Sequence, residues 1–262
     1  MGAVGTRVAL VTGASRGIGR GVAIGLGEAG ATVVVTGRTA EEVEATAGLV
    51  TDAGGSGIGA VCDHRHDDQV HAVFDRVQRD LGRLDVLVNN ATAVPDLPLL
   101  FAQTPFWELP VQMWDDLFDV GLRSHFVASA AAAPLMVADS GGLIVNISSV
   151  GAIARIGAIL PYGVAKTALD RMTADMAEEL RDHHVTVLSL WPPPTSTPGM
   201  LAAAGADDDP TSWSVPEFTG RVVAALAASD HFSRTGQSLR ARELAAQLGV
   251  DDALYSAAEP SR

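Results

Sequence analysis

Short apolar runs alternate with amphipathic segments along most of the chain. The first run, residues 8–12, stops at a glycine cluster, and a helical pattern follows at residues 18–29. Continuous apolar runs between amphipathic helices are typical of parallel strands in a sheet that is covered on both faces. Because crossovers between parallel strands are right-handed, we expect an α/β chain, a single-domain doubly wound Rossmann fold with a mostly seven-stranded parallel sheet and helices on both faces. The other predicted strands lie at residues 32–36, 58–62, 84–89, 142–148, 185–190 and 237–241, and the other predicted helices include residues 40–52, 67–81 and 111–137.

The length and charge of the chain narrow the class of protein. Its 262 residues suit one domain, which we expect at residues 6–250, with a C-terminal tail at 251–262. The formal net charge of -13 argues against nucleic acid as a partner, since binding a phosphate backbone needs clustered Lys and Arg. The single cysteine, Cys62, fits a reducing compartment. Because no continuous apolar run reaches about 18 residues, no membrane span is predicted, and we expect a cytoplasmic location.

A glycine-rich stretch lies between the first strand and the first helix. Gly13, Gly17 and Gly19 would let the backbone turn sharply and approach a pyrophosphate, which would rest on the helix N-terminus. Such a triplet also occurs in ordinary glycine-rich turns, but its place in the first strand-helix unit favours a dinucleotide site. Three residues separate the first two glycines, instead of the single residue of the common dinucleotide fingerprint.

The spacing of this loop and the motifs after it resemble the short-chain dehydrogenase/reductase family. Asn89, Asn90 and Ala91 match a structural motif of that family after the fourth strand. Ser149 and then, 13 residues later, Tyr162 of a Tyr-x-x-x-Lys motif match its catalytic set.

The resemblance covers residues 6–201 and continues more loosely to residue 249. It implies a nicotinamide-dependent oxidoreductase that forms a homo-oligomer, a dimer or a tetramer, partly through helices near residues 111–137 and 161–181. Asp63, after the third strand, matches an acid that binds adenine in the family. The residues that the glycine loop and the resemblance assign to the cofactor are Gly13, Ser15, Arg16, Gly17, Ile18, Gly19, Arg38, Asp63, Asn90, Tyr162, Lys166 and Thr197.

The end of the second strand distinguishes between the two nicotinamide cofactors. A carboxylate there would hydrogen-bond the ribose 2′-OH of NAD and repel the 2′-phosphate of NADP. This chain has Arg38 at that end and no acid until Glu41. Arg38 can stack on adenine and pair with the phosphate, and Arg16 is a second candidate. The alternative is that both arginines are solvated surface residues; we expect NADP(H) in preference to NAD(H).

Three residues are predicted to be catalytic, namely Ser149, Tyr162 and Lys166. Hydride transfer to a carbonyl needs a proton donor at the oxygen, and Tyr162 is the natural acid. Lys166 follows one helical turn later on the same face. Its charge, with that of an oxidised nicotinamide, should lower the pKa of Tyr162, while Ser149 would orient the substrate oxygen. A Tyr and a Lys at this spacing are often an ordinary amphipathic pair, but the upstream motifs favour the catalytic interpretation.

The chain departs from the family pattern at three places. Gly121 stands where the family has an Asn that helps to hold a water beside the Lys, which puts the proton relay in question. Thr92 replaces a glycine after the Asn-Asn-Ala motif, and residues 192–197 replace the usual Pro-Gly segment, although Thr197 still matches. The exchange at Gly121 is shared with the dehydrogenase/reductase SDR family member 1 group, which this chain resembles more narrowly. The segments that carry this narrower resemblance are residues 85–91, 106–108, 113–116, 120–123 and 190–192.

The substrate site is predicted less directly. Residues 94–107 form a long apolar insertion that, with Trp191 and residues 200–204, would wall an apolar pocket. The alternative is that Phe101, Phe106 and Trp107 pack under a loop or at a subunit interface. Residues 198–215 have the composition of a mobile lid.

His64 and His66 have a spacing that metal ligands also use. No second cluster accompanies them, so we expect both to lie in a solvated loop and helix start, and we expect no metal site.

The leading hypothesis is an NADP(H)-dependent carbonyl reductase or alcohol dehydrogenase that acts on an apolar carbonyl or secondary alcohol. A second hypothesis is a 3-oxoacyl thioester reductase, although no basic patch for a carrier's phosphopantetheine is evident. A third, from another class, is an NADP-binding regulator or scaffold without efficient turnover, which the exchange at Gly121 supports and the intact catalytic residues oppose.

Overall fold

The computed structural model describes residues 7–93, 101, 104–155, 159–206 and 208–252. At its centre is one seven-stranded sheet, in the order β3-β2-β1-β4-β5-β6-β7, with every pair of neighbours parallel. This confirms the predicted doubly wound Rossmann fold. The strands are β1 Val8–Val11, β2 Thr32–Gly37, β3 Ser56–Val61, β4 Val86–Asn89, β5 Gly142–Ile147, β6 Val185–Trp191 and β7 Ser238–Arg240.

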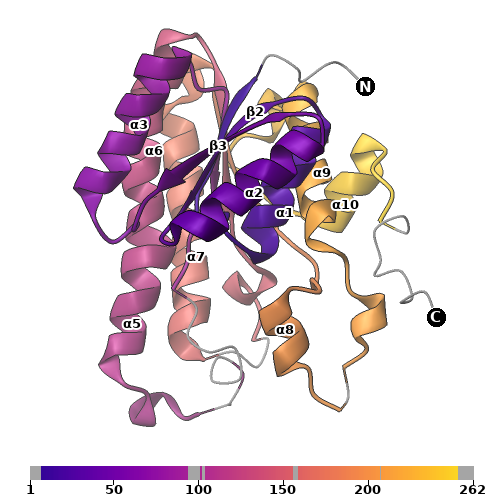
Figure 1. Cartoon of the computed structure of the whole chain (residues 1–262). Coiled ribbons are helices and arrows are strands. Elements are labelled where there is room, and N and C mark those ends of the chain that lie inside the picture. Colours follow the sequence, from indigo (N-terminus) through magenta and orange to yellow (C-terminus); the bar gives the residue numbers. More distant parts are fainter. Residues whose placement is uncertain (1–6, 94–100, 102–103, 156–158, 207, 253–262) are drawn as a thin grey trace, which may run out of the picture.

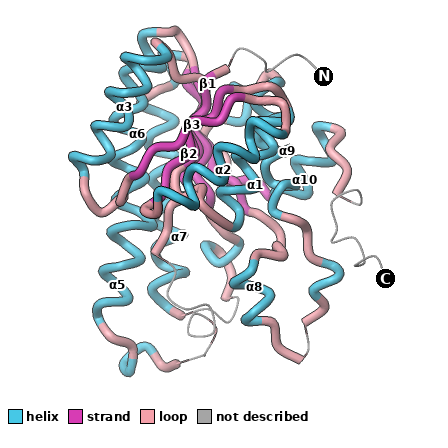
Figure 2. The backbone as a smooth tube through the Cα atoms, in the orientation of Figure 1, coloured by secondary structure: helices cyan, strands magenta, loops and turns pink. Residues whose placement is uncertain are grey.

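Helices cover both faces of the sheet (Figures 1 and 2). One face packs against α1 (Gly17–Glu28), α2 (Ala40–Asp52), α9 (Pro216–Ala228) and α10 (Ala241–Leu248). The other face packs against α3 (Asp67–Leu81), α6 (Ser124–Ala138) and α7 (Leu160–Glu179). Two further helices, α5 (Val111–Phe118) and α8 (Pro198–Ala203), extend beyond the strand ends.

Both faces of the strands are apolar because the sheet lies between these two helical layers. In β1, Ala9 and Val11 belong to the core on the α1 side, whereas Val8 and Leu10 belong to the core on the α3 side. Successive side chains of a strand point to opposite faces, so a strand buried on both faces must be a continuous apolar run. This is the pattern from which the strands are predicted.

The long helix predicted at residues 111–137 is not regular. A π-helical segment, Asp119–Arg123, joins α5 to α6, and Gly121 lies inside it. A π segment accommodates an additional residue within a helical turn, and glycine has a low helical propensity. The prediction of one uninterrupted α-helix is therefore wrong at this point, directly beside the candidate site.

The same stretch has the length and composition of a membrane span. Within residues 111–138, a window of 18 residues reaches a mean hydropathy of 1.3, and half of it is buried inside the protein. A core helix packed on a sheet has the same properties, so this is weak evidence for a span.

Candidate active site

The predicted site residues gather at the carboxyl edge of the sheet. The glycine loop follows β1, Asn90 follows β4, Ser149 follows β5, and Thr197 comes after β6. Tyr162 and Lys166 lie in the first half of α7. In open parallel sheets this edge, near the point where the strand order reverses between β1 and β4, is where ligands bind.

The glycine loop leaves backbone exposed at the start of α1. Gly13 has φ +62°, and a Cβ atom there would lie 2.8 Å from the Cα of Ala91. Gly17 has φ +57° and begins α1, whose cap residue Arg16 makes no side-chain capping bond. A Cβ at Gly19 would overlap the side-chain amide of Asn90. The loop therefore requires glycine at these positions, and it presents the first N–H groups of a helix without a side-chain cap.

Hydrogen bonds hold this loop against the turn after β4. Thr12 Oγ1 accepts bonds from the backbone N–H groups of Asn90 (2.9 Å) and Ala91 (3.0 Å). Asn90 Nδ2 donates to the carbonyl oxygens of Thr12 (2.9 Å) and Gly13 (3.0 Å). The side chain of Asn90 therefore holds the glycine loop against the turn after β4.

His125 completes this brace and is not predicted from the sequence. Its Nε2 lies 2.8 Å from the carbonyl oxygen of Ala91, so Nε2 carries the proton and donates. The side chain is buried, and Nδ1 has no partner. Burial, followed by the charge of Lys166, lowers the pKa of His125 to about 3. His125 is therefore neutral at physiological pH. The sequence marks His125 only by its position, four residues after the unusual Gly121.

A buried network of amides and hydroxyls fixes α7 to the sheet. Asn89 Nδ2 donates to Asn146 Oδ1 (2.9 Å) and to Ser129 Oγ (2.9 Å). Asn146 Nδ2 in turn donates to Thr173 Oγ1 on α7 (2.8 Å). Because these bonds join β4, β5, α6 and α7, they set the position of the helix that carries Tyr162.

Ser149, Tyr162 and Lys166 form one cluster. Ser149 faces Tyr162 and lowers the pKa of its phenol, and Ser149 Oγ accepts a bond from the N–H of Gly151 (3.1 Å). Lys166 Nζ lies 5.8 Å from the centroid of the Tyr162 ring and donates to the carbonyl oxygen of Ile147 (2.8 Å). Lys166 is buried and is also the only lysine in the chain.

Burial dominates the electrostatics of this cluster. Burial lowers the pKa of Lys166 to about 8, and the charge of Asp170 opposes that shift. Burial raises the pKa of Tyr162, and the effect of Ser149 only partly offsets it. The pKa of Tyr162 is therefore raised in the chain without cofactor, and its lowering beside an oxidised nicotinamide stays a prediction. That prediction relied on the positive charge of an oxidised nicotinamide as well as on Lys166, and the chain supplies only the latter.

Two arginines that are predicted to bind the 2′-phosphate of NADP, Arg16 and Arg38, make no contact with a carboxylate among the described residues. Arg38 follows β2 and Arg16 precedes α1; both are exposed. Within the described part of the chain, four arginines make neither a side-chain hydrogen bond nor an ion pair, while the others do. These four are Arg7, Arg16, Arg38 and Arg155.

Asp63 and His64 follow β3 near the same edge. Asp63 Oδ1 accepts a bond from the backbone N–H of Arg65 (3.0 Å). His64 is buried, with Nε2 2.8 Å from Thr36 Oγ1, and burial lowers its pKa to about 4. The expectation of a solvated His64 is therefore wrong, because the chain turns inward here and buries Cys62 and His64. His66 is exposed, as predicted.

A cavity of about 710 Å³ opens beside Tyr162. Its walls include Phe106 and Trp107 from the predicted insertion, and Ile153 and Arg155 from the segment after β5. Most of the insertion, residues 94–100 and 102–103, lies outside the described residues.

The expected contribution of Trp191 to the cavity is wrong. Trp191 is buried, and its indole Nε1 donates to Asp170 Oδ2 (3.1 Å). The guanidinium of Arg240 lies 5.7 Å from its ring. Trp191 therefore packs behind α7, where Asp170 sits one turn after Lys166.

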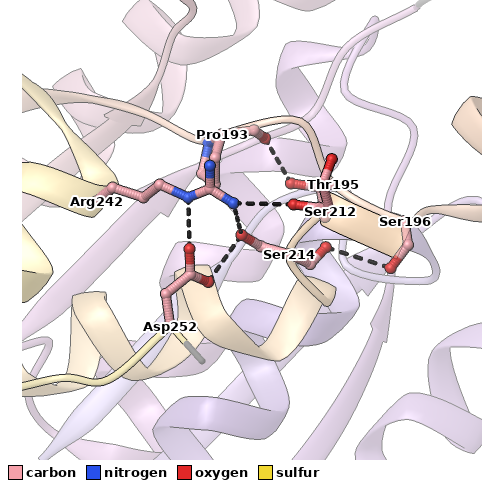
Figure 3. Close-up of polar contacts among 7 residues, drawn as sticks. All are labelled: Pro193, Thr195, Ser196, Ser212, Ser214, Arg242 and Asp252. Atoms are coloured by element: carbon pink, nitrogen blue, oxygen red, sulfur yellow. Dashed lines mark hydrogen bonds and ion pairs between the residues drawn. The ribbon is translucent and has the colours of Figure 1, made fainter. Parts of the chain in front are cut away.

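The base of the predicted lid is tied to the C-terminal part of the chain (Figure 3). Arg242 donates to the carbonyl oxygen of Ser212 (3.2 Å) and to Ser214 Oγ (3.1 Å), and it also bonds Asp252. Ser214 Oγ donates to Asp252 (2.8 Å). At the other end, Thr197 Oγ1 caps α8 by accepting from Met200 N (3.3 Å). The structure therefore anchors both ends of the segment; its mobility stays a prediction.

Comparison with known proteins agrees with this geometry. The family model described as short chain dehydrogenase matches residues 7–208. The chain belongs to this family, whose members are NAD(P)-dependent oxidoreductases.

Individual relatives narrow the comparison. Over 260 residues the chain is 41% identical to "Dehydrogenase/reductase SDR family member 1" of Mus musculus, covering 94% of this chain and 83% of that protein. It is 34% identical to a 3beta-hydroxysteroid dehydrogenase of Mediterraneibacter gnavus, covering 81% and 79%. Among solved structures, a putative gluconate dehydrogenase from Agrobacterium tumefaciens superposes with a TM-score of 0.82 at 27% identity, covering 90% and 94%. The narrower resemblance to the SDR family member 1 group is thereby confirmed.

Proposed function

We propose that this protein is an NADP(H)-dependent carbonyl reductase or alcohol dehydrogenase, which transfers hydride between the nicotinamide and a carbonyl or secondary alcohol of an apolar substrate. The observation that carries the proposal is the cluster of Tyr162, Lys166 and Ser149 beside an apolar cavity. The predicted residue types thus occur together at the ligand-binding edge of the sheet.

The loop after β1 fits a dinucleotide. Its glycines expose backbone N–H groups, and α1 begins without a side-chain cap, as an anion site requires. The residues proposed to hold the cofactor are Gly13, Ser15, Arg16, Gly17, Ile18, Gly19, Arg38, Asp63, Asn90, Tyr162, Lys166 and Thr197. When bound, the nicotinamide supplies or accepts the hydride.

Tyr162 is the proposed acid in reduction and base in oxidation. Its hydroxyl would give a proton to the carbonyl oxygen, while Ser149 orients that oxygen. Lys166 is protonated at neutral pH, since its pKa is about 8. Its charge, together with that of the oxidised nicotinamide, would stabilise the tyrosinate left after proton transfer.

At Gly121 the chain has no side chain where other members of the family have an Asn. A Cβ at Gly121 would approach only Thr92 Oγ1, at 3.2 Å. We propose that water beside Gly121 takes the part that the Asn side chain has in other members of the family. Proton exchange between Lys166 and solvent would then proceed through that water.

The preference for NADP(H) rests on two unpaired cations. The chain has 31 acidic and 18 basic residues, yet Arg16 and Arg38 find no carboxylate partner among the described residues. A 2′-phosphate between them would gain charge-assisted hydrogen bonds. The dissociation constants of NADPH and NADH are measured by fluorescence, and in Arg38→Gln that of NADPH is expected to rise more than that of NADH, because only NADPH carries the 2′-phosphate.

The protein is also proposed to be a cytoplasmic homo-oligomer, a dimer or a tetramer. Large apolar side chains are exposed on α5, α6 and α7, including Val111, Trp114, Phe126 and Val164. Exposed apolar groups on adjoining helices favour association. Sedimentation equilibrium of the whole chain tests the oligomeric state.

The test of the function is NADPH oxidation against ketones, aldehydes, quinones and steroids. Tyr162→Phe is expected to abolish turnover while NADPH binding is retained, and Tyr255→Phe, the other tyrosine, serves as the control. If no compound is reduced although NADPH binds tightly, a regulator or scaffold without turnover replaces this proposal.

A further inference from the structure

The cavity beside Tyr162 has one charged residue, Arg155, among the described residues that line it. Its walls are made largely of apolar residues such as Phe106, Trp107, Ile153 and Leu160, and Arg155 is the only charged residue among its described lining. An apolar cavity with one placed polar group binds an apolar molecule in a fixed orientation.

Arg155 has no partner within the described chain. It makes no side-chain hydrogen bond and no ion pair, although acidic residues outnumber basic ones. Of the three other arginines without such a bond, Arg16 and Arg38 lie at the proposed phosphate site, and Arg7 precedes β1 at the opposite edge of the sheet. Unpaired guanidinium groups at the carboxyl edge thus occur where a ligand is proposed to bind.

The backbone before Arg155 is held in place relative to Tyr162. Thr167 Oγ1, on α7, donates to the carbonyl oxygen of Ala152 (2.7 Å), and Ala154 N donates to the carbonyl oxygen of Val150 (3.1 Å). Since Thr167 lies on the helix that carries Tyr162, the backbone that leads to Arg155 is fixed relative to Tyr162.

We infer that the cavity takes an apolar ketone, or the corresponding alcohol, that carries a carboxylate, which Arg155 binds while the carbonyl faces Tyr162. The reduction of this ketone rests on the proposed function, whereas its binding in the cavity does not. Arg155 determines specificity and does not touch the reacting atoms. A guanidinium binds a carboxylate through two parallel hydrogen bonds, which an ester cannot reproduce.

The test compares acids with their own esters. A series of benzoylalkanoates, whose carboxylate stands at increasing distance from the ketone, is measured together with the methyl esters. Binding to the protein with NADP+ is followed by calorimetry, and reduction is followed by NADPH oxidation. We expect one acid of the series to bind about tenfold more tightly than its ester, as one charged hydrogen-bonded contact provides.

Substitutions of Arg155 distinguish the effect of its charge on ligand binding from the effect of its packing. In Arg155→Gln the preference for that acid is expected to disappear, because Kd and KM rise more for the acid than for its ester. Arg155→Lys is expected to keep part of the preference. Arg171→Gln, which removes an exposed guanidinium paired with Asp175 on α7, is the control. Equal binding of every acid and ester in the wild type, or equal losses for both in Arg155→Gln, would overturn the inference.

The binding measurement distinguishes the two proposals. If the acid binds in an Arg155-dependent way but is not reduced, the proposed reaction fails and the ligand class stands. If esters are reduced as well as acids and Arg155→Gln changes neither, the reaction stands and the ligand class fails.

Discussion

The charge state of Lys166 is set by two opposing influences. Burial lowers its pKa to about 8, and the carboxylate of Asp170 raises it. The other groups that face Lys166 are Tyr162 on the same helix, His125 from α6 and the carbonyl of Ile147 from β5. A lysine with this pKa is close to losing its charge at mildly alkaline pH.

Asp170→Asn should therefore narrow the alkaline range of activity. The amide can still accept the Trp191 hydrogen bond, so the main change is loss of a negative charge. The pKa of Lys166 should fall, and the alkaline limb of the profile of kcat/KM against pH should shift to lower pH. Because Lys166 is the only lysine, isotope-labelled lysine gives one NMR signal that reports its pKa directly. Asp175→Asn, on the exposed face of α7, is the control; identical profiles in both variants would refute the role of Asp170.

For individual residues, the sequence predicts which side chains gather at the candidate site but not which groups surround them. Ser149, Tyr162 and Lys166 meet as the motif spacing predicts, because one helical turn separates the last two. The burial of His64 and the brace from His125 to Ala91 depend on contacts between distant segments. Trp191 shows the same limit, since its aromatic character suggests a pocket wall and only the position of Asp170 shows its actual role.

At the scale of elements, α1 is placed by close packing on α9. A Cβ at Gly25 would lie 2.5 Å from the carbonyl carbon of Gly220 and 2.7 Å from the backbone nitrogen of Arg221. These are backbone atoms, so relief would require the two helices to separate. The glycine loop at the start of α1 would move with its helix.

Gly25→Ala is expected to lower the free energy of unfolding by about 1–3 kcal/mol, as overpacking does. Gly48→Ala on α2 is the matched control, because nothing lies within 4 Å of a Cβ there. That change should raise the free energy of unfolding by about 0.5–1 kcal/mol through better helix propensity. Urea unfolding of both variants measures the difference, and equal effects would refute close α1–α9 packing.

Elements with strong local patterns are predicted to within a few residues. Helices α2 and α3 begin and end where the amphipathic pattern places them, at Ala40–Asp52 and Asp67–Leu81. The break in the long helix at Asp119–Arg123 is missed, because the apolar pattern continues across it. The strand predicted at residues 58–62 instead runs from Ser56 to Val61, since pairing with β2 includes Ser56 and Gly57 despite their poor strand propensity.

At the scale of the whole molecule, two buried histidines make stability depend on pH. The pKa of His64 is about 4 and that of His125 about 3, below the ordinary value of 6.5, because burial disfavours the charged form. Below pH about 6.5 these two histidines become protonated in the unfolded chain but stay neutral in the folded chain. The stability contributed by the neutral histidines is present above that pH and is lost as pH falls toward the folded values.

The free energy of unfolding should therefore fall between pH about 6.5 and 5, with each histidine adding up to about 1.4 kcal/mol per pH unit. His64→Gln and His125→Gln should each flatten this slope, whatever their effect on stability at neutral pH. His71→Gln, which alters an exposed histidine of α3, should leave it unchanged. Denaturant unfolding across this pH range measures the slope, and parallel curves for all four proteins would contradict the assignment.

The overall architecture is the most predictable feature, because alternating strands and helices with right-handed crossovers leave few arrangements of one domain. The positions of Arg16, Arg38 and Arg155 show what is not predictable. Their lack of carboxylate partners depends on where 31 acidic side chains lie in space, and no local pattern reveals that. The proposed binding of a carboxylate by Arg155 can therefore be argued only from the folded chain.

In the proposed reaction, Tyr162 exchanges a proton with the substrate beside a bound nicotinamide. In Tyr255→Phe, Tyr162 is the only tyrosine, so the tyrosinate absorbance reports its pKa directly. We expect a midpoint above the ordinary value of about 10 in the free protein, because burial raises the pKa of Tyr162. We also expect saturating NADP+ to move the midpoint to lower pH, and to move it less in Lys166→Gln. A midpoint that does not move on binding NADP+ would contradict this role of Tyr162.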